Sequence, residues 1–212
     1  MKNYFIGIDQ SLNSSGICIL TYEDNKLKKE YFTIVKTAKL NKKEIIAEES
    51  NKNFKYNICE NIVNLKEYEN DNHLKEFYKT KNFIAVLDKI YEIIKSNVNK
   101  KNANIYIVQE GISYGSSLRT KSIFDLAGLN YMLRYKLLEF SRKFDNFRFW
   151  IIPPTEIKKF ATGKGNANKE FMIATFKAIY PKFDLPKIDD VCDAYFMARY
   201  AKKLSENIQN NE

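Results

Sequence analysis

Three segments of β-strand character follow one another at the start of the chain, and they limit its possible folds more than any other feature. An apolar run at residues 4–8 ends on Asp9. Residues 16–22 and 28–35 then repeat the strand pattern, with a turn signal at residues 25–26 between them. Strands separated by such short connections pair side by side in opposite directions. The chain therefore predicts a sheet that begins with three antiparallel strands.

Beyond residue 80 the hydrophobic pattern alternates between helix and strand. Apolar residues recur at helical spacing in residues 83–96, and β-type runs cover residues 105–108 and 147–152. Because strands joined by helical crossovers pair in parallel, the predicted class is α/β. It has a mixed five-stranded sheet, with three antiparallel strands and then parallel crossovers, flanked by helices. Four further helices are predicted, at residues 121–140, 155–160 (capped by Thr155), 169–179 and 189–204.

Residues 37–80 interrupt this pattern. They are dense in Lys, Glu and Asn, their periodicity is weak, and they suggest helical fragments only around residues 44–49 and 56–65. We interpret them as an insertion that is mobile or partly helical. A length of 212 residues, 44% of them hydrophobic, fits one domain over residues 1–212 that carries this insertion.

The chain is basic, with a formal net charge of +9. This balance favours anionic partners such as nucleic acid, an acidic membrane surface or an acidic protein, although a Lys-rich composition serves solubility equally well. The three Cys residues do not have the spacing of a zinc or thioredoxin-type motif, so we expect free thiols. No apolar run approaches the roughly 18 residues of a membrane-spanning helix, so we expect a cytoplasmic protein with no membrane partner.

Two acidic residues lie where predicted buried strands end. Asp9 follows the first strand, and Glu110 follows the strand at residues 105–108. Taken singly, either acid suits an ordinary turn or strand end. The carboxyl ends of strands, however, are where α/β folds place ligand chemistry, and a buried carboxylate is costly unless it is paired or bound to a metal.

A second acidic pair lies on the last predicted helix. Asp190 and Asp193 are three residues apart and therefore share one face. A helix N-terminus tolerates acids because its dipole favours negative charge, so helix capping is one explanation. The same face continues with Ala194, Met197 and Ala201, which suit packing on a sheet. Acids that continue a core-facing stripe indicate a site in which a divalent cation relieves their repulsion.

The available side chains limit the chemistry. Four carboxylates without nearby Cys or His suit a hard cation, Mg²⁺ or Mn²⁺. The only histidine, His73, lies in the insertion, which argues against Ser-His-Asp, Cys-His and HNH-type catalysis. The Gly163-Lys164-Gly165 loop lacks the rest of a Walker motif, which argues against an ATPase. The lysines around this loop either bind phosphate or form a solvated surface.

Four motifs occur in a recognisable order. They are GIDQSLNSSG at residues 7–16, IVQE at residues 107–110, the basic Gly-x-Gly segment IKKFATGKGNANK at residues 157–169, and DVCDA at residues 190–194. Together they resemble the motifs of RuvC-type Holliday-junction resolvases, particularly phage-like members. The motifs lie toward both ends of the chain, and residues 37–80 depart from the compact pattern of that family.

The resemblance implies an RNase H-like fold, a homodimer, and paired Mg²⁺-dependent nicking of four-way DNA junctions, with two ions per active site and Mn²⁺ as a substitute. Asp189 stays open as an alternative to Asp190, although helix spacing favours Asp190 and leaves Asp189 as a cap. Tyr114 lies one residue away from the position at which this family has an aromatic residue that probes the centre of the junction. The implied metal ligands and catalytic acids are Asp9, Glu110, Asp190 and Asp193, with Lys169 as the catalytic lysine. The implied DNA contacts are Lys158, Lys164, Lys169, Tyr114 and Arg119.

Other functions remain open at this stage. A nuclease of this fold could act more broadly on flaps and other branched DNA, or the chain could bind junctions without cutting them, although all four acids are present. An actin-like or sugar-kinase ATPase also begins with a strand, Gly-x-Asp and a hairpin, but it needs two such lobes and a longer chain. The helix at residues 121–140 has a wide apolar side, which suits either a dimer interface or packing on the sheet.

Overall fold

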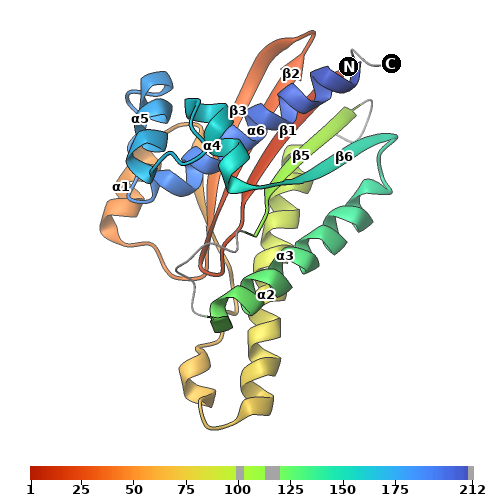
Figure 1. Cartoon of the computed structure of the whole chain (residues 1–212). Coiled ribbons are helices and arrows are strands. Elements are labelled where there is room, and N and C mark those ends of the chain that lie inside the picture. The colour runs from red at the N-terminus through yellow and green to blue at the C-terminus, as the bar shows by residue number, and fades with distance from the viewer. Residues whose placement is uncertain (99–102, 113–119, 210–212) are drawn as a thin grey trace.

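The computed structural model describes residues 1–98, 103–112 and 120–209, and within these ranges one mixed sheet of six strands forms its centre. Their order across the sheet is β4-β3-β2-β1-β5-β6 (Figure 1). The first three strands pair antiparallel, and β5 and β6 continue from β1 in parallel. The strands are β1 (Lys2–Asp9), β2 (Ser14–Glu23), β3 (Lys26–Lys36), β4 (Phe54–Ile58), β5 (Ala103–Glu110) and β6 (Asn146–Ile152). The predicted α/β class and strand directions are confirmed, whereas the predicted number of five strands is wrong.

The additional strand comes from the segment that the sequence presented as an insertion. β4 pairs in parallel with the second half of β3, and it buries Phe54 and Tyr56. A helix around residues 56–65 is therefore wrong, because burial at alternate residues follows the period of a strand. The helical fragment expected at residues 44–49 corresponds to α1 (Lys42–Ser50), which Asn41 and Glu44 stabilise with a capping box. The 3₁₀ turn η1 (Leu65–Tyr68) and α2 (Asn72–Asn97) follow.

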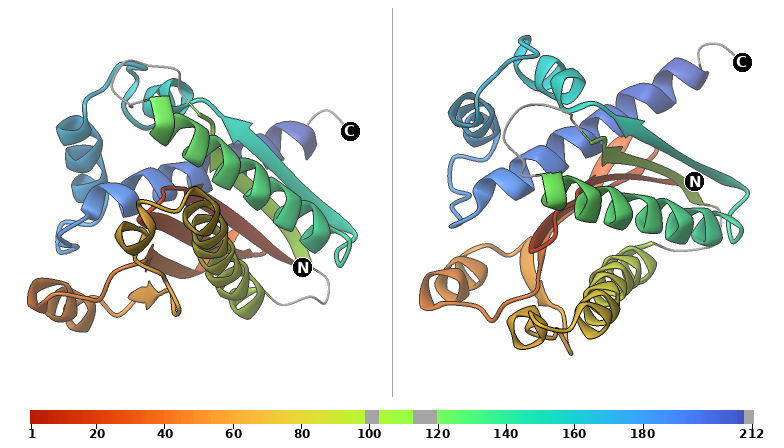
Figure 2. Two further views of the ribbon diagram at one scale, coloured as in Figure 1. Left: turned by 90° about the horizontal axis from the view of Figure 1, so that it is seen from below. Right: turned by 60° about the horizontal axis from the view of Figure 1, so that its bottom comes forward.

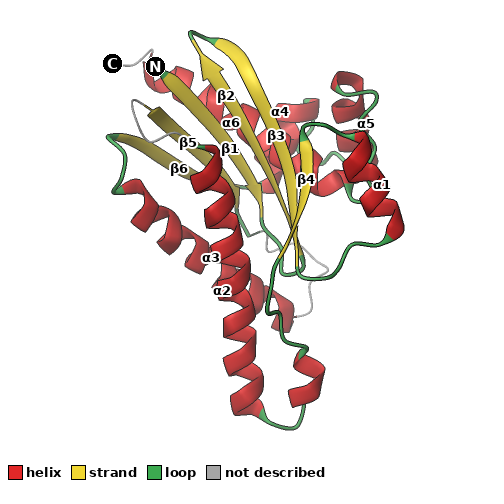
Figure 3. Ribbon diagram, turned by 180° about the vertical axis from the view of Figure 1, so that it is seen from behind, coloured by secondary structure: helices red, strands yellow, loops and turns green. Residues whose placement is uncertain are grey.

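Helices cover both faces of the sheet (Figures 1 and 2). α2 and α3 (Thr120–Ser141) pack on one face, and α2 continues beyond the end of the sheet with η1 beside it (Figure 3). α6 (Ile188–Gln209) crosses the other face, with α4 (Pro154–Thr162) and α5 (Lys169–Ile179) next to it. Each face has its own hydrophobic core, because successive side chains of a strand point to opposite sides.

Two local predictions differ by small distances from the structure. The β2–β3 turn lies at Asp24 and Asn25, which both have positive φ, one residue earlier than expected; Asn and Asp tolerate this conformation best among non-glycine residues. Thr155 does not cap a helix. α4 begins at Pro154 after Pro153, which makes no side-chain capping bond, because the fixed φ of proline already suits a first helical turn. Among the helices described, none is both long and apolar enough to cross a bilayer.

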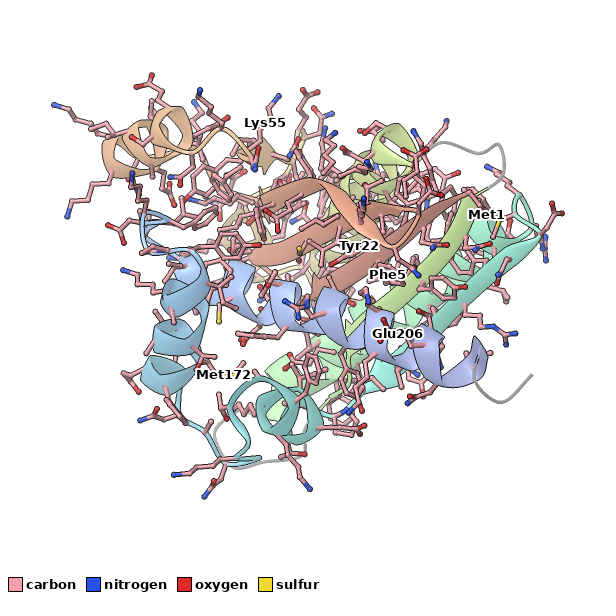
Figure 4. All side chains as sticks on the ribbon, turned by 90° about the horizontal axis from the view of Figure 1, so that it is seen from above. Met1, Phe5, Tyr22, Lys55, Met172 and Glu206 are labelled. Atoms are coloured by element: carbon pink, nitrogen blue, oxygen red, sulfur yellow. The ribbon has the colours of Figure 1, made fainter. Side chains whose placement is uncertain are left out.

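Helix α6 lies in direct backbone contact with the β1–β2 hairpin. A Cβ atom on Gly7 would lie 1.9 Å from the carbonyl oxygen of Ala194, and one on Gly16 would lie 2.0 Å from the carbonyl oxygen of Asp190. These distances are far shorter than van der Waals contact, so only glycine permits this packing. Farther along the helix, Phe5 and Tyr22 lie between the sheet and α6 (Figure 4). The two glycines thus determine how closely the first turns of α6 approach the end of β1.

We expect Gly16→Ala to lower the free energy of unfolding by about 3 kcal/mol or more, because the methyl group forces α6 away from the sheet. Urea denaturation measures this loss. The matched control is Gly128→Ala in the exposed face of α3, where an added Cβ meets nothing within 4 Å; it should stabilise the protein by up to about 1 kcal/mol, since alanine favours a helix. A Gly16→Ala protein of unchanged stability would contradict the close packing.

Candidate active site

The sheet brings Asp9 and Glu110 together at one edge. β1 and β5 are parallel neighbours, so their carboxyl ends lie side by side, and both acids are the last residues of their strands. Both side chains point to the face that α6 covers, because they are in phase with Phe5 and Val108 of that core. The Asp9 carboxyl donates a hydrogen bond to the Glu110 carboxylate, an arrangement that requires one of the two to be protonated.

The beginning of α6 adds two more carboxylates to this edge. Asp190 and Asp193 lie in the first two turns of the helix, and both act electrostatically on Asp9. Burial raises the pKa of Asp9 well above its usual range, and the charges of Glu110, Asp193 and Asp190 raise it further. Four acids from three separate parts of the sequence therefore form one site in which negative charge is strongly disfavoured.

The other members of the site show the same effect. Burial raises the pKa of Asp193 to about 7, and the charge of Glu110 is the next largest cause. Burial also raises the pKa of Asp190 to about 6, opposed by a hydrogen bond from Ser14. The pKa of Glu110 is raised by burial, while the hydrogen bond from Asp9 and the charge of Lys158 act in the opposite direction. Perturbation of this size by burial and like charges is typical of functional sites.

Asp189 and Asp190 have different surroundings. Asp190 accepts a 2.5 Å hydrogen bond from the hydroxyl of Ser14, the first residue of β2. Asp189 forms an ion pair with Lys169 at the start of α5. Asp190 contributes to the raised pKa of Asp9, whereas Asp189 is not among the groups that do so. This placement favours Asp190 as the partner of Asp9 and assigns Asp189 to the support of Lys169.

Lys158 on α4 lies near Glu110 and Asp193, because its charge acts on both. It borders two adjoining hollows, and Asp193 borders both as well. One hollow, of about 200 Å³, also contains Lys169 and Asp189, and the other, of about 310 Å³, contains Glu110. The positive charge of Lys158 counteracts the raised pKa of both Asp193 and Glu110. The site therefore combines a negative centre with lysines at its border, an arrangement suited to a phosphate group held beside a metal ion.

The remaining predicted DNA contacts lie farther from the acids or outside the described residues. Lys164 follows the left-handed Gly163 that ends α4, and its ammonium group lies 6.0 Å from the ring centroid of Phe171. Lys164 is exposed. Tyr114 and Arg119 lie outside the residues that the structure describes.

The donor set of the site fits a hard divalent cation. All four acids supply oxygen ligands, and their mutual repulsion is what a bound cation would relieve. Within the described ranges, no three Asp, Glu, His or Cys side chains are oriented so that they could hold one ion together. Instead the acids take nearby hydrogen-bond partners: Asp9 donates to Glu110, and Asp190 accepts from Ser14. The fit thus rests on ligand chemistry and on the shared location of the four residues.

Several supporting residues were not identified from the sequence. Ser14 was part of the first motif but carried no assigned role, and the pairing of Asp189 with Lys169 was not foreseen. Gly7 and Gly16 also lay within the motif, and a glycine on each side of a strand-end acid was the available signal for close backbone approach. None of these contacts is local, because each joins α6 to a distant part of the chain.

The arrangement of sheet and helices is the RNase H-like fold of RuvC. A solved structure of Thermus thermophilus RuvC matches with a TM-score of 0.51 and 15% identity, over 93% of this chain and 91% of that chain. The T. thermophilus RuvC in complex with Holliday junction substrate matches with a TM-score of 0.53 and 11% identity, over 93% and 90%. The yeast mitochondrial Holliday junction resolvase Ydc2 matches with a TM-score of 0.48 and 13% identity, over 95% and 80%. No protein-family model and no curated protein sequence matches.

The raised pKa of Asp193 predicts a pH-dependent penalty on the stability of the metal-free protein. Below about pH 3 the Asp193 carboxyl is protonated in both the folded and the unfolded state, so it does not affect the free energy of unfolding. As pH rises from 3.8 toward 7, the unfolded chain ionises while the folded site resists, so stability falls. Asp193→Asn should therefore unfold at higher urea than the wild type at pH 8, by on the order of 3 kcal/mol, and similarly to it at pH 4.

The measurement is urea denaturation in EDTA, and the exposed Asp145→Asn, at the turn before β6, is the control that should show no such pH-dependent gain. Mg²⁺ should stabilise the wild type at pH 8, since it binds only the folded site. A constant difference between wild type and Asp193→Asn from pH 4 to pH 8 would contradict the assignment of the raised pKa.

Proposed function

We propose that the chain is a metal-dependent endonuclease that resolves four-way DNA junctions. The observation that carries the proposal is the convergence of Asp9, Glu110, Asp190 and Asp193 from two strands and a helix on one partly buried edge, with Lys158 beside them. The RNase H-like fold and a basic chain of net charge +9 support it. A neighbour with the same fold was crystallised with Holliday junction substrate.

In this proposal the four acids hold two Mg²⁺ ions, for which Mn²⁺ can substitute. When bound, such ions polarise the phosphodiester and favour ionisation of water near neutral pH. Asp193 would accept a hydrogen bond from the attacking water, a role suited to a buried carboxylate that borders both hollows of the site. The expected products carry a 5′-phosphate and a 3′-hydroxyl.

The lysines of the site position the DNA backbone and offset its charge. Lys158 and Lys169 border the 200 Å³ hollow together with Asp193, where a phosphate would be held. Asp189 fixes the ammonium group of Lys169 there. Charge on a phosphoryl oxygen in the transition state is stabilised best by such preplaced cations. Lys164, Tyr114 and Arg119 extend the proposed contact to the surrounding DNA.

A symmetric homodimer would place one active site on each of two strands of a four-way junction. α3 offers a candidate interface, because its outer face carries large exposed side chains, three of them at seven-residue intervals. The inner face of the same helix packs on the sheet through buried leucines, so the two roles considered for this helix are compatible. The outer residues are Phe124, Tyr131, Tyr135 and Leu138, which are between 52% and 72% exposed.

Asp9→Asn and Asp190→Asn should each reduce Mg²⁺-dependent cleavage of a synthetic four-way junction by more than about 100-fold, since each removes a charged oxygen ligand. Asp189→Asn is the matched control one residue away. It should lose only about 10-fold, because Asp189 acts through Lys169. Gel analysis of end-labelled strands gives the rates. Wild-type cleavage by Asp9→Asn would contradict the proposed site.

The same assay distinguishes the possible substrates when a four-way junction, a flap and a linear duplex are compared in Mg²⁺. We expect preferential cutting of the junction. Equal cutting of all three substrates would contradict specific resolution of junctions but would still be consistent with a nuclease. Junction binding without cutting would support the non-catalytic alternative.

Replacement of Tyr131 and Tyr135 by Glu should convert the protein from a dimer to a monomer, because two charges would have to be buried in the interface. Light scattering coupled to size-exclusion chromatography measures the mass. Ile45→Glu, on the 46% exposed position of α1, is the control and should leave the dimer intact. A monomeric wild type, or a dimer that survives the double replacement, would contradict the α3 interface.

A further inference from the structure

Three buried amide side chains lie at the edge of the sheet next to the acids. Gln10 directly follows Asp9, Gln109 directly precedes Glu110, and Asn130 projects from α3. Their residues are 5%, 0% and 2% exposed. Because successive residues of a strand point to opposite faces, Glu110 faces α6 and Gln109 faces α3. Gln10, just after the end of β1, lies beside Gln109. The edge therefore has an acidic side and an amide side.

The amides form a short hydrogen-bonded chain that leaves part of their capacity unused. Gln109 donates to the side-chain oxygen of Gln10 at 2.7 Å, and Asn130 donates to the backbone carbonyl of Glu110 at 3.1 Å. Among the described residues, the amide nitrogen of Gln10 and the side-chain oxygens of Gln109 and Asn130 have no hydrogen-bond partner. Buried polar groups without partners are rare in proteins and call for an explanation.

Two of these amides open into the 310 Å³ hollow that contains Glu110, Lys158 and Asp193. Gln10 and Asn130 line it, and each carries one buried side-chain polar atom, a donor and an acceptor respectively, that has no partner and could be turned to a ligand by rotation of the amide. Its other walls include apolar or backbone surface from Gly111, Ile112, Leu126 and Pro154. The hollow has a size typical of sites for small ligands or parts of ligands, and it adjoins the acids that the proposed reaction uses.

The chemistry of the hollow selects its ligand. A phosphate offers only acceptors and would leave the oxygen of Asn130 unsatisfied beside negative charges. A nucleobase has a flat apolar face and an edge with both donors and acceptors, which suits amide side chains and apolar walls. Each amide presents one NH₂ and one oxygen whichever way it is turned. The hollow thus matches one unpaired base better than it matches the DNA backbone.

We propose that this hollow captures one unpaired nucleobase of the cleaved strand, next to the scissile phosphate, and that Gln10 and Asn130 thereby determine which sequences are cut. The inference rests on the proposed nuclease function. At a branch point the bases nearest the crossing strands can leave their stack at the least energetic cost. Capture of one such base would align the adjacent phosphate with the acids and Lys158, and bases that pair poorly with the amides would be cut slowly.

The first test maps cut positions on junctions with randomised sequence around the branch, using sequencing of the cleaved ends. The wild type should prefer one base at a fixed position by about 10-fold to 100-fold, as expected for paired amide contacts. Gln10→Met preserves side-chain length but removes the amide, and it should flatten this preference. Asn104→Leu removes a buried amide at the opposite end of β5 and should retain it. A wild type that cuts all sequences equally, or a Gln10→Met protein with wild-type preference, would overturn the proposal and leave the nuclease intact.

The second test uses the unmodified protein and needs no variant to fold. An abasic site at the preferred position should slow wild-type cleavage by about 10-fold or more, and the same change at other positions should have little effect. Binding in Ca²⁺ of a junction that carries 2-aminopurine at that position should raise its fluorescence, because the base leaves its stack. Unchanged fluorescence on bound junctions would overturn base capture even without cleavage. Failure to bind junctions would overturn both this inference and the proposed function.

Discussion

The close contact between α6 and the β1–β2 hairpin is the interaction on which the rest of the site depends. It exists because Gly7 and Gly16 have no side chain where the helix backbone passes. The approach of Asp190 toward the end of β1 is set by the same contact, since the backbone of Asp190 itself lies against Gly16. Side chains in place of these two glycines would hold the helix farther from the sheet and would carry its acids away from Asp9.

This packing concentrates negative charge where it is unfavourable, and the surrounding residues limit the cost. Asp190 receives a hydrogen bond from Ser14, Lys158 opposes the effect of burial on Glu110 and Asp193, and the N-terminal position in α6 favours acids through the helix dipole. The remaining repulsion still raises the pKa of Asp9. A site of this kind favours the binding of a cation. Without a cation, it contributes less to the free energy of unfolding than an apolar core of the same size would.

The segment between β3 and α2 is connected to the site through the sheet. β4 extends the sheet beyond β3, and a buried ion pair joins Lys36, at the end of β3, to Glu44 of α1. Lys36 lies opposite Ser14 in the β2–β3 pairing, so this segment braces the strand end from which Ser14 donates to Asp190. Residues that the sequence presented as an insertion are therefore joined, through β3, to the strand that carries Ser14.

Much of this architecture was predictable from local patterns. The strand and helix periods of residues 2–36 and 103–204 identified most elements and the direction of strand pairing, because burial on one or both faces imposes those periods directly on the sequence. β4 was not predictable, since only Phe54 and Tyr56 distinguish it within a Lys- and Asn-rich stretch. The four acids were recognisable as a group only through their motifs, because each alone suits a strand end or a helix start.

The sequence by itself determined the α/β class, the antiparallel beginning of the sheet and the acidic residues at the ends of its elements. Only the tertiary structure decided that Asp190 pairs with Ser14 whereas Asp189 pairs with Lys169, and that Gln10 and Asn130 border the same hollow as Glu110. The physical reason is that strand and helix periods reflect burial along one segment, whereas these contacts depend on how closely and in what rotation separate segments pack.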